Sequence, residues 1–213
     1  MNRKEIKAEA KAKIKGNKWN ILWPLLVIGV ISGVIGAIFG GTSLNDLTDT
    51  VNVSPMMAVG SLISSLVTCF FSAGYIKYLI TFVRTGKFDS NEIIKTIKEK
   101  WLNILIATIL VSIVVTFCSF LFVIPGIIMA LAYSFVMYLV VDTEVSGSDA
   151  LRESRQMMKG YKWNYFVFGL SFIGWIILGV FTLGILYIWL IPYMMTASVI
   201  YYDKLKANTK KAE

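Results

Sequence analysis

The chain has 213 residues and a net charge of +8, and 56% of its residues are hydrophobic while only 16% are charged. Soluble domains carry about 25% charged residues, so one water-soluble core cannot enclose this much apolar surface. The absence of histidine excludes the commonest metal ligand and general base near neutral pH. These properties predict an integral membrane protein whose lysines contact anionic lipid rather than nucleic acid.

The first predicted element is a short basic helix over residues 2–15, in which Ile6, Ala10 and Ile14 recur four apart. The apolar run after it is longer than a signal-peptide core and has no cleavage motif, so we interpret it as an uncleaved first span. Six apolar segments in all have the character of membrane spans. Their predicted bounds are 19–39, 56–83, 101–122, 127–141, 163–181 and 184–202.

Two pairs of these spans are joined by very short, uncharged turns. The sequence VIPG (123–126) separates the third span from the fourth, and TLG (182–184) separates the fifth from the sixth. Each pair is therefore predicted to be a helical hairpin. Pro125 is expected to end the first helix of its hairpin, and Pro192 is expected to kink the sixth span. Cys69 and Cys118 lie within spans and are interpreted as small apolar residues.

A basic-aromatic hexamer recurs along the chain, as KGNKWN at 15–20 and KGYKWN at 159–164, with a variant KEKWLN at 98–103. Each copy follows a short helical pattern and precedes a predicted hairpin. We therefore predict an all-α membrane domain over 1–213, with six transmembrane helices as three parallel hairpin repeats. Each repeat begins with a cytoplasmic amphipathic interfacial helix, and the units cover roughly 1–83, 88–142 and 146–203, followed by a basic tail, 204–213. Coincidence is the alternative, since Lys and Trp favour every membrane boundary.

The helix termini in these units carry recognisable signals. Gly16 and Gly160 are expected to end surface helices in the left-handed conformation. The middle copy has no glycine, which predicts a surface helix that continues into the third span. Ser148 is expected to cap the third surface helix, and residues 89–92 (DSNE) have the form of a capping box.

The distribution of charge predicts the orientation. Every Lys and Arg except Lys77 lies in the N-terminal arm, the second-to-third connection, the fourth-to-fifth connection or the tail. The long loop on the other side, 40–55, carries Asp46 and Asp49 but no cation. The positive-inside rule therefore predicts that both termini face the cytoplasm and that the chain is a multi-pass protein of the cytoplasmic membrane.

The candidate site residues at the membrane boundary are the cations and tryptophans of the three hexamers. Lysine holds the headgroup level and tryptophan anchors the interface. These candidates for contact with lipid headgroups are Lys15, Lys18, Trp19, Lys100, Trp101, Lys159, Lys162 and Trp163.

Two further candidates are polar residues inside or at the end of spans, Lys77 and Asp142. Lys77 either extends its ammonium to the inner headgroups or pairs with an acid such as Asp142. Asp142 and Asp203 close the fourth and sixth spans, and the simpler interpretation is that they only mark span ends.

Small and hydroxyl residues form stripes along the first three spans. Such stripes either pack helices closely or line a polar pathway. They are Gly29 with Gly33, Gly36 with Gly40, then Ser61, Ser65, Thr68 and Ser72, and finally Thr108, Ser112 and Thr116.

No pattern of catalytic or metal-binding residues occurs in the sequence, so we expect a protein that is not an enzyme and has no cofactor. The parallel arrangement also differs from transporters built on inverted repeats.

The C-terminal half resembles a known family. IPGIIMALAYSFVMYLVVD (124–142), SGSDALRESRQMMKGYKWNYF (146–166), FIGWIILGVFTLGILYIWLIPY (172–193) and YYDKL (201–205) are similar to the bacterial membrane proteins grouped as domain of unknown function 975. The resemblance is strongest over 124–205 and weaker upstream, where FVRTGKF (82–88) and the basic N-terminal helix are also similar. Met137 stands where the family often has proline. The resemblance implies an integral membrane protein and no particular reaction.

These observations lead to one leading expectation and one alternative. We expect an uncharacterised, non-enzymatic membrane protein that acts at the cytoplasmic leaflet in membrane or envelope organisation, assembly or regulation. Its expected partners are anionic inner-leaflet lipids, with a protein partner or a second copy of the chain as further possibilities. The alternative is a small transporter, exporter component or channel, in which Lys77 and the hydroxyl stripes line the route.

Overall fold

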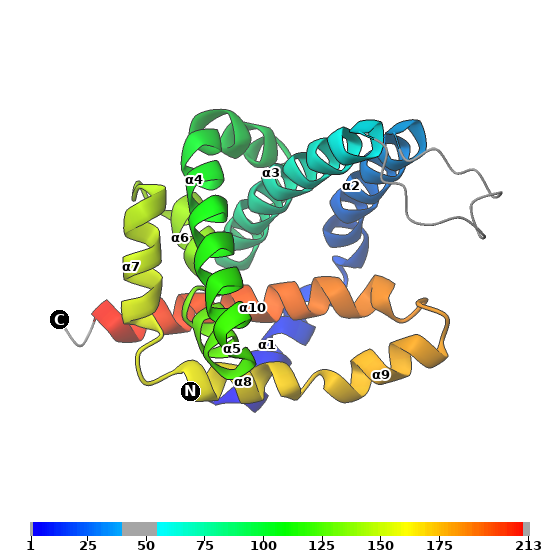
Figure 1. The fold of residues 1–213 in the computed structure, drawn as a ribbon. Helices are drawn as coiled ribbons and strands as arrows, with labels where there is room; N and C mark the ends of the chain where they lie inside the picture. The colour runs from blue at the N-terminus through cyan, green and yellow to red at the C-terminus, as the bar shows by residue number, and fades with distance from the viewer. Residues whose placement is uncertain (1, 40–54, 211–213) are drawn as a thin grey trace.

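The computed structural model describes residues 2–39 and 55–210, and every regular element in these residues is a helix (Figure 1). The predicted loop with Asp46 and Asp49 lies outside the described residues, as does Gly40. The helices are α1 (Arg3–Ile14), α2 (Lys18–Phe39), α3 (Pro55–Thr85), α4 (Asn91–Leu121), α5 (Val123–Ala132), α6 (Val136–Asp142), α7 (Gly147–Met157), α8 (Lys162–Leu170), α9 (Ile173–Phe181) and α10 (Tyr187–Lys210).

Five segments of the described chain are long and apolar enough to cross a membrane, which fits a multi-pass membrane protein. They correspond to the first five predicted spans. The sixth predicted span lies in α10, which is long but continues into the charged residues Asp203, Lys204 and Lys206. The five segments are Lys18–Ile35, Val59–Thr85, Asn91–Phe120, Val123–Asp142 and Lys162–Phe181.

The two short turns lie where the sequence predicts them. Between α4 and α5 the chain turns at Phe122, which is extended at φ −156° and ψ 139°. Between α9 and α10 it turns through Gly184, whose φ of 85° lies in the left-handed region. The prediction for Pro125 is wrong, because Pro125 lies in the first turn of α5, where no backbone N–H is needed. Pro192 lies within α10, which continues through it.

Two predicted spans are interrupted. The fourth breaks between α5 and α6, and the fifth breaks between α8 and α9. Distant side chains donate to carbonyls at both breaks: the Ser154 hydroxyl donates to the Ala132 carbonyl at 2.9 Å, and the Lys7 ammonium donates to the Ser171 carbonyl at 2.9 Å. These contacts satisfy backbone groups that the interrupted helices leave unpaired.

Before each predicted hairpin, the surface helix ends where the connection contains a glycine and continues where it does not. Gly16 and Gly160 have φ of 94° and 81°, as predicted for residues that end a helix in the left-handed region. The middle joint has no glycine, and α4 runs as one helix from Asn91 to Leu121 through Trp101, which confirms the predicted continuation. The second surface helix is therefore not separate from the span, and the threefold repeat stays a prediction.

One predicted cap is wrong and the other is partly confirmed. Ser146, rather than Ser148, caps α7, because its side chain accepts the Asp149 N–H at 3.3 Å. At the start of α4, Asp89 of the predicted capping box accepts the Asn91 N–H at 3.0 Å, whereas Ser90 makes no side-chain cap. The correction at α7 moves the cap by two residues, within the usual uncertainty of helix ends.

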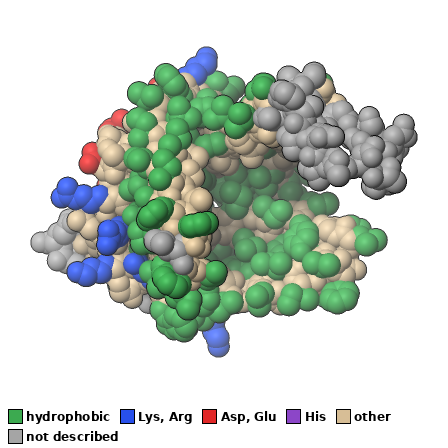
Figure 2. All heavy atoms as spheres, in the orientation of Figure 1, with side chains coloured by type: hydrophobic (Ala, Val, Ile, Leu, Met, Phe, Trp, Pro, Cys, Tyr) green, Lys and Arg blue, Asp and Glu red, His purple; other side chains and the backbone are tan. Residues whose placement is uncertain are grey.

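Burial is concentrated at one end of the hairpins. The packed core includes Tyr78, Phe135 and Tyr202, which are at most 1% exposed. Near the turns the apolar side chains are exposed, with Phe120 at 89% and Leu183 at 93%. Figure 2 shows this apolar surface and a hollow between the α2–α3 hairpin and the α9–α10 hairpin. Such a surface suits contact with lipid tails.

Pro24 lies inside α2 and leaves the carbonyl of Asn20, four residues earlier, without its helical donor. The Tyr78 hydroxyl of α3 donates to that carbonyl at 2.7 Å. The neighbouring Tyr75 hydroxyl donates to the Ile21 carbonyl at 2.9 Å. The gap that Pro24 leaves in the first span is thus compensated by α3.

We expect Tyr78→Phe to destabilise the folded protein by about 1 kcal/mol, because the Asn20 carbonyl loses its donor. Pro24→Ala restores a backbone N–H, so the same tyrosine substitution should cost less in that background. Thermal stability of the four proteins of this double-mutant cycle in detergent measures the coupling. Equal costs of Tyr78→Phe in both backgrounds would contradict the assignment.

Candidate functional site

The three predicted interface tryptophans all face outward. Trp19 is 70% exposed, Trp101 is 52% exposed and Trp163 is 74% exposed. Trp23, Trp175 and Trp189 are also at least 40% exposed, so none of the six tryptophans belongs to the core. This placement suits residues that lie at a membrane boundary.

Some of the cations that flank the spans hold helix ends together rather than facing solvent. Lys13 donates to the Val83 carbonyl near the end of α3 at 2.8 Å. Lys100 donates to the Thr143 carbonyl beyond the end of α6 at 2.6 Å and lies 3.4 Å from the Glu144 carboxylate. Through its bond to the Thr143 carbonyl, Lys100 caps the C-terminal end of α6. Because its side chain is only 13% exposed, the structure does not present Lys100 to headgroups as the sequence predicts.

The first and last helices are joined by ion pairs. Lys204 of α10 lies 3.3 Å from Glu5 and 3.0 Å from Glu9, both on α1. Partial burial works against the charged lysine, but the two carboxylates outweigh it and raise the pKa of Lys204. Ile6 and Ala10 are fully buried next to these pairs. The apolar face of α1 is therefore packed against protein.

A junction of charged groups joins the ends of α3, α6 and α10. The Arg84 guanidinium pairs with both Asp142 and Asp203, and Lys206 pairs with Asp142. The Tyr202 hydroxyl donates to Asp142 at 2.9 Å. Since the Asp142 side chain is only 2% exposed, the interpretation that Asp142 and Asp203 only mark span ends is wrong. Their charges connect three helices that are distant in the sequence.

Lys77 does not reach this junction. Asp142 is bound by Arg84, Lys206 and Tyr202, so the predicted pair of Lys77 with Asp142 is wrong. Within the part of the chain that the structure describes, Lys77 is half-buried and makes no ion pair. The extension of its ammonium to headgroups stays a prediction.

A groove lies between α1 and the α9–α10 hairpin, with a volume of about 490 Å³. One edge carries Lys11, Lys15 and Lys18, so two of the predicted headgroup lysines meet here. Lys18 lies 4.8 Å from the ring centre of Trp189, a cation–π contact. The opposite wall is apolar and aromatic. We call this groove the elbow groove; its lining residues are Lys11, Ile14, Lys15, Lys18, Trp175, Leu186, Trp189, Leu190 and Tyr193.

A second basic hollow lies at the joint between α7 and α8. It is lined by Gln156 and by four cations, which we call the α7 patch: Arg152, Arg155, Lys159 and Lys162. No ion pair involves these cations in the described residues. The predicted candidates Lys159 and Lys162 are thus joined by two arginines that could bind phosphate oxygens bidentately.

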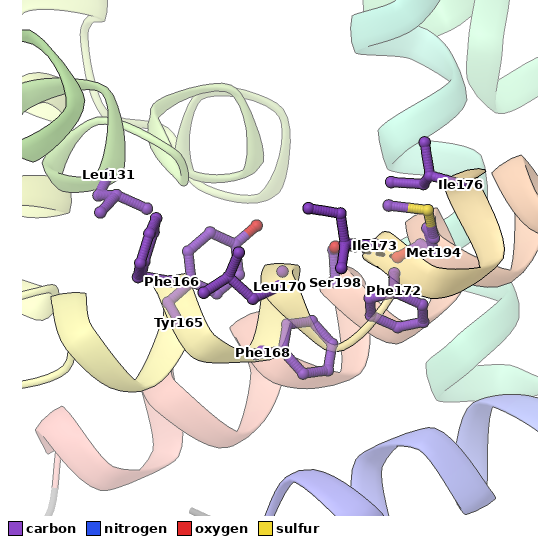
Figure 3. A pocket seen from close by; sticks show the side chains of 11 residues that line it. Leu131, Tyr165, Phe166, Phe168, Leu170, Phe172, Ile173, Ile176, Met194 and Ser198 are labelled. Carbon is purple, nitrogen blue, oxygen red and sulfur yellow. Dashed lines mark hydrogen bonds between the residues drawn. The ribbon is translucent and has the colours of Figure 1, made fainter. Parts of the chain in front are cut away.

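An apolar pocket of about 340 Å³ lies along α8, α9 and α10 (Figure 3). Tyr165, Phe168 and Phe172 are among its lining residues, together with Met194 and Ser198 of α10. The Ser198 hydroxyl donates to the Met194 carbonyl at 2.9 Å. The pocket has no charged lining residue, which fits an apolar occupant such as a lipid tail better than an ion.

Two hydroxyls of the stripes, Thr68 and Thr108, contact side chains of a neighbouring helix. The Ser32 and Thr68 hydroxyls lie 3.2 Å apart between α2 and α3, and Cys69 and Thr108 lie 3.1 Å apart between α3 and α4. Ser112 donates within its own helix. Gly29 and Gly33 have no atom within 4 Å of where a Cβ would lie, so the described residues make no close helix approach there.

Sequence reasoning missed several residues of the junction and of the elbow groove. From the sequence, Arg84 and Lys206 are only two of the cations that flank the spans, although in the structure they pair with Asp142 and join the helices of the junction. Trp175 and Trp189 lie inside predicted spans, and no spacing rule places them beside Lys18. These groupings depend on contacts between the first and last helices.

The comparisons with known proteins identify a family for the chain. No curated protein and no solved structure matches the chain. The model of a family described as "Protein of unknown function (DUF975)" matches residues 1–130 and 120–209, which together cover nearly the whole chain. The match extends well upstream of the region in which the sequence motifs are strongest. The chain therefore belongs to the DUF975 family of proteins of unknown function.

Proposed function

We propose that the chain is a non-enzymatic protein of the bacterial cytoplasmic membrane that collects anionic lipid at the cytoplasmic leaflet and so organises the membrane around it. The elbow groove and the α7 patch are the lipid-facing sites in this proposal. Both termini face the cytoplasm, where the anionic leaflet attracts clustered cations.

The observation that carries the proposal is the division of the cations into two sets. One set is used within the protein: Lys7, Lys13, Arg84, Lys100, Lys204 and Lys206 bind carbonyls or carboxylates. The cations of the elbow groove and the α7 patch make no ion pair in the described residues, although acids occur on the same helices. Unneutralised cations at the level of the exposed tryptophans favour a negatively charged surface as their partner.

The alternative of a transporter or channel has less support. The hydroxyl stripes donate to carbonyls of their own helices or bridge neighbouring helices. In the described residues no buried side-chain nitrogen or oxygen lacks a partner. A polar route usually presents unpaired groups to a water-filled path, so the packing interpretation is favoured.

We expect neutralisation of the α7 patch to lower the preference for anionic lipid by at least about tenfold. Each cation near an anionic surface contributes about 1 kcal/mol, so Arg152→Gln, Arg155→Gln, Lys159→Gln and Lys162→Gln together should have a clear effect. Mass spectrometry of lipids retained after reconstitution in mixed phosphatidylglycerol and phosphatidylcholine measures the preference. Added salt should reduce it in the unmodified protein.

Lys13→Gln is the matched control, because Lys13 binds the Val83 carbonyl inside the fold. This variant should lower thermal stability and leave the lipid preference unchanged. The α7 patch variant should lower the lipid preference and leave thermal stability unchanged. Proteolysis of terminal tags in sealed vesicles checks that the orientation is retained. An unmodified protein that retains both lipids in proportion to their supply would refute the proposal.

A further inference from the structure

The elbow groove differs from the α7 patch because one of its edges is cationic and its other wall is aromatic and apolar. Lys11 and Lys15 are exposed on α1, and Lys18 is exposed at the start of α2. Facing them are Trp175 of α9 and Trp189 of α10, which are 53% and 46% exposed. A ligand that fills this groove must satisfy both a positive edge and an apolar wall.

No carboxylate balances the positive edge. The nearby acids of α1, Glu5 and Glu9, are paired with Lys204 of α10. The other lysines of α1 that point toward the protein, Lys7 and Lys13, bind backbone carbonyls. The three lysines that line the groove make no ion pair in the described residues. The groove therefore selects an anion.

The groove is preformed by contacts on both sides. Ile6, Ala10 and Ile14 bury the apolar face of α1 against the fold, and the Tyr193 hydroxyl of α10 donates to the Lys7 carbonyl at 3.3 Å. The cation–π contact of Lys18 with Trp189 joins the positive edge to the aromatic wall. Preorganisation of this kind reduces the entropic cost of binding a ligand.

We propose that the elbow groove binds a single anionic phospholipid. Its phosphate lies among Lys11, Lys15 and Lys18, and an acyl chain lies along the wall formed by Trp175, Leu186 and Trp189. A free phosphate would leave the apolar wall unused, and a zwitterionic lipid would bring its own cation to the lysines. This inference rests on the proposed function and narrows it from a leaflet to one bound molecule.

The test uses the full chain purified in mild detergent, delipidated and titrated with phosphatidylglycerol under native mass spectrometry. We expect the first phosphatidylglycerol molecule to bind with much higher affinity than the molecules that bind after it. Lys11→Gln, Lys15→Gln and Lys18→Gln together should weaken that first binding event at least roughly tenfold, because each surface cation is worth about fivefold. Trp189→Ala should weaken it as well, although it removes no charge.

The matched control removes the same charge from exposed lysines outside the groove, through Lys4→Gln, Lys87→Gln and Lys98→Gln. It should leave the first binding event within about twofold. Thermal stability of every variant checks folding, and Trp189→Ala provides an independent measurement if the triple groove variant unfolds.

The possible outcomes separate this inference from the proposed function. If both triple variants lose phosphatidylglycerol equally, only bulk charge acts, and the groove is refuted while the proposed function stands. If the groove variants keep the first lipid, the inference is wrong. Displacement of the lipid by millimolar inorganic phosphate would identify a free anion as the ligand and also overturn it. A protein with no preference between phosphatidylglycerol and phosphatidylcholine would refute both proposals.

Discussion

Asp142→Asn is expected to lower the stability of the folded protein by about 3 kcal/mol, because removing one member of a buried ion pair leaves the other charges uncompensated. Asp142 is 2% exposed and is bound by Arg84, Lys206 and Tyr202. The Arg84 side chain is 40% exposed and can recover some hydration, which keeps the cost at the low end for such pairs. Thermal unfolding in detergent, followed by loss of the monodisperse peak, measures the change.

Two control substitutions rank the effect. Asp203→Asn should cost less, since that side chain is 26% exposed and pairs with Arg84 alone. Asp89→Asn should cost little, because Asp89 is exposed and makes only a local contact with the Asn91 N–H. If all three substitutions had the same small effect, the junction would not hold the three helices together.

Gly147→Ala is expected to destabilise the protein by about 1–3 kcal/mol through overpacking. A Cβ at Gly147 would lie 2.6 Å from the Asn103 carbonyl oxygen and 2.9 Å from the Ala107 nitrogen. Both are backbone atoms of α4, so no side chain can rotate away. The first turn of α7 would have to move off α4, and Ser154 of α7 would then lose its position beside the Ala132 carbonyl.

Gly169→Ala and Gly174→Ala are the matched controls, because nothing lies within 4 Å of a Cβ at either position. Both residues have helical backbone near a helix end, where alanine is tolerated at least as well as glycine. These variants should therefore be as stable as the parent or slightly more stable. The same thermal measurement compares all three, and a Gly147→Ala protein as stable as the controls would contradict the close approach.

The sequence is informative wherever local chemistry decides the structure. Apolar length predicts the spans, glycine at Gly16 and Gly160 predicts helix ends, and its absence before Trp101 predicts the continuous α4. The breaks in the fourth and fifth spans could not be predicted, because the sequence around Tyr133 and Phe172 contains no proline and no charge to mark them. Those breaks are supported by Ser154 and Lys7 from distant helices.

The candidate site shows the same limit. All cations at the flanks look alike in the sequence, so Lys100 and Lys18 receive the same prediction. The structure separates them, since Lys100 caps a helix end while Lys18 faces an aromatic wall. This difference is set by what another part of the chain places beside each lysine, and no local pattern contains that information.

The pairing of α1 with α10 also sets an order of assembly during synthesis. Lys204 and the fully buried Leu205 lie about 190 residues beyond Ile14. At a synthesis rate of about 5–20 residues per second, α1 waits roughly 10–40 s for its partner helix. During that interval the apolar face of Ile6, Ala10 and Ile14 cannot pack against α10, because α10 has not yet been synthesised. The elbow groove is consequently among the last features of the molecule to form.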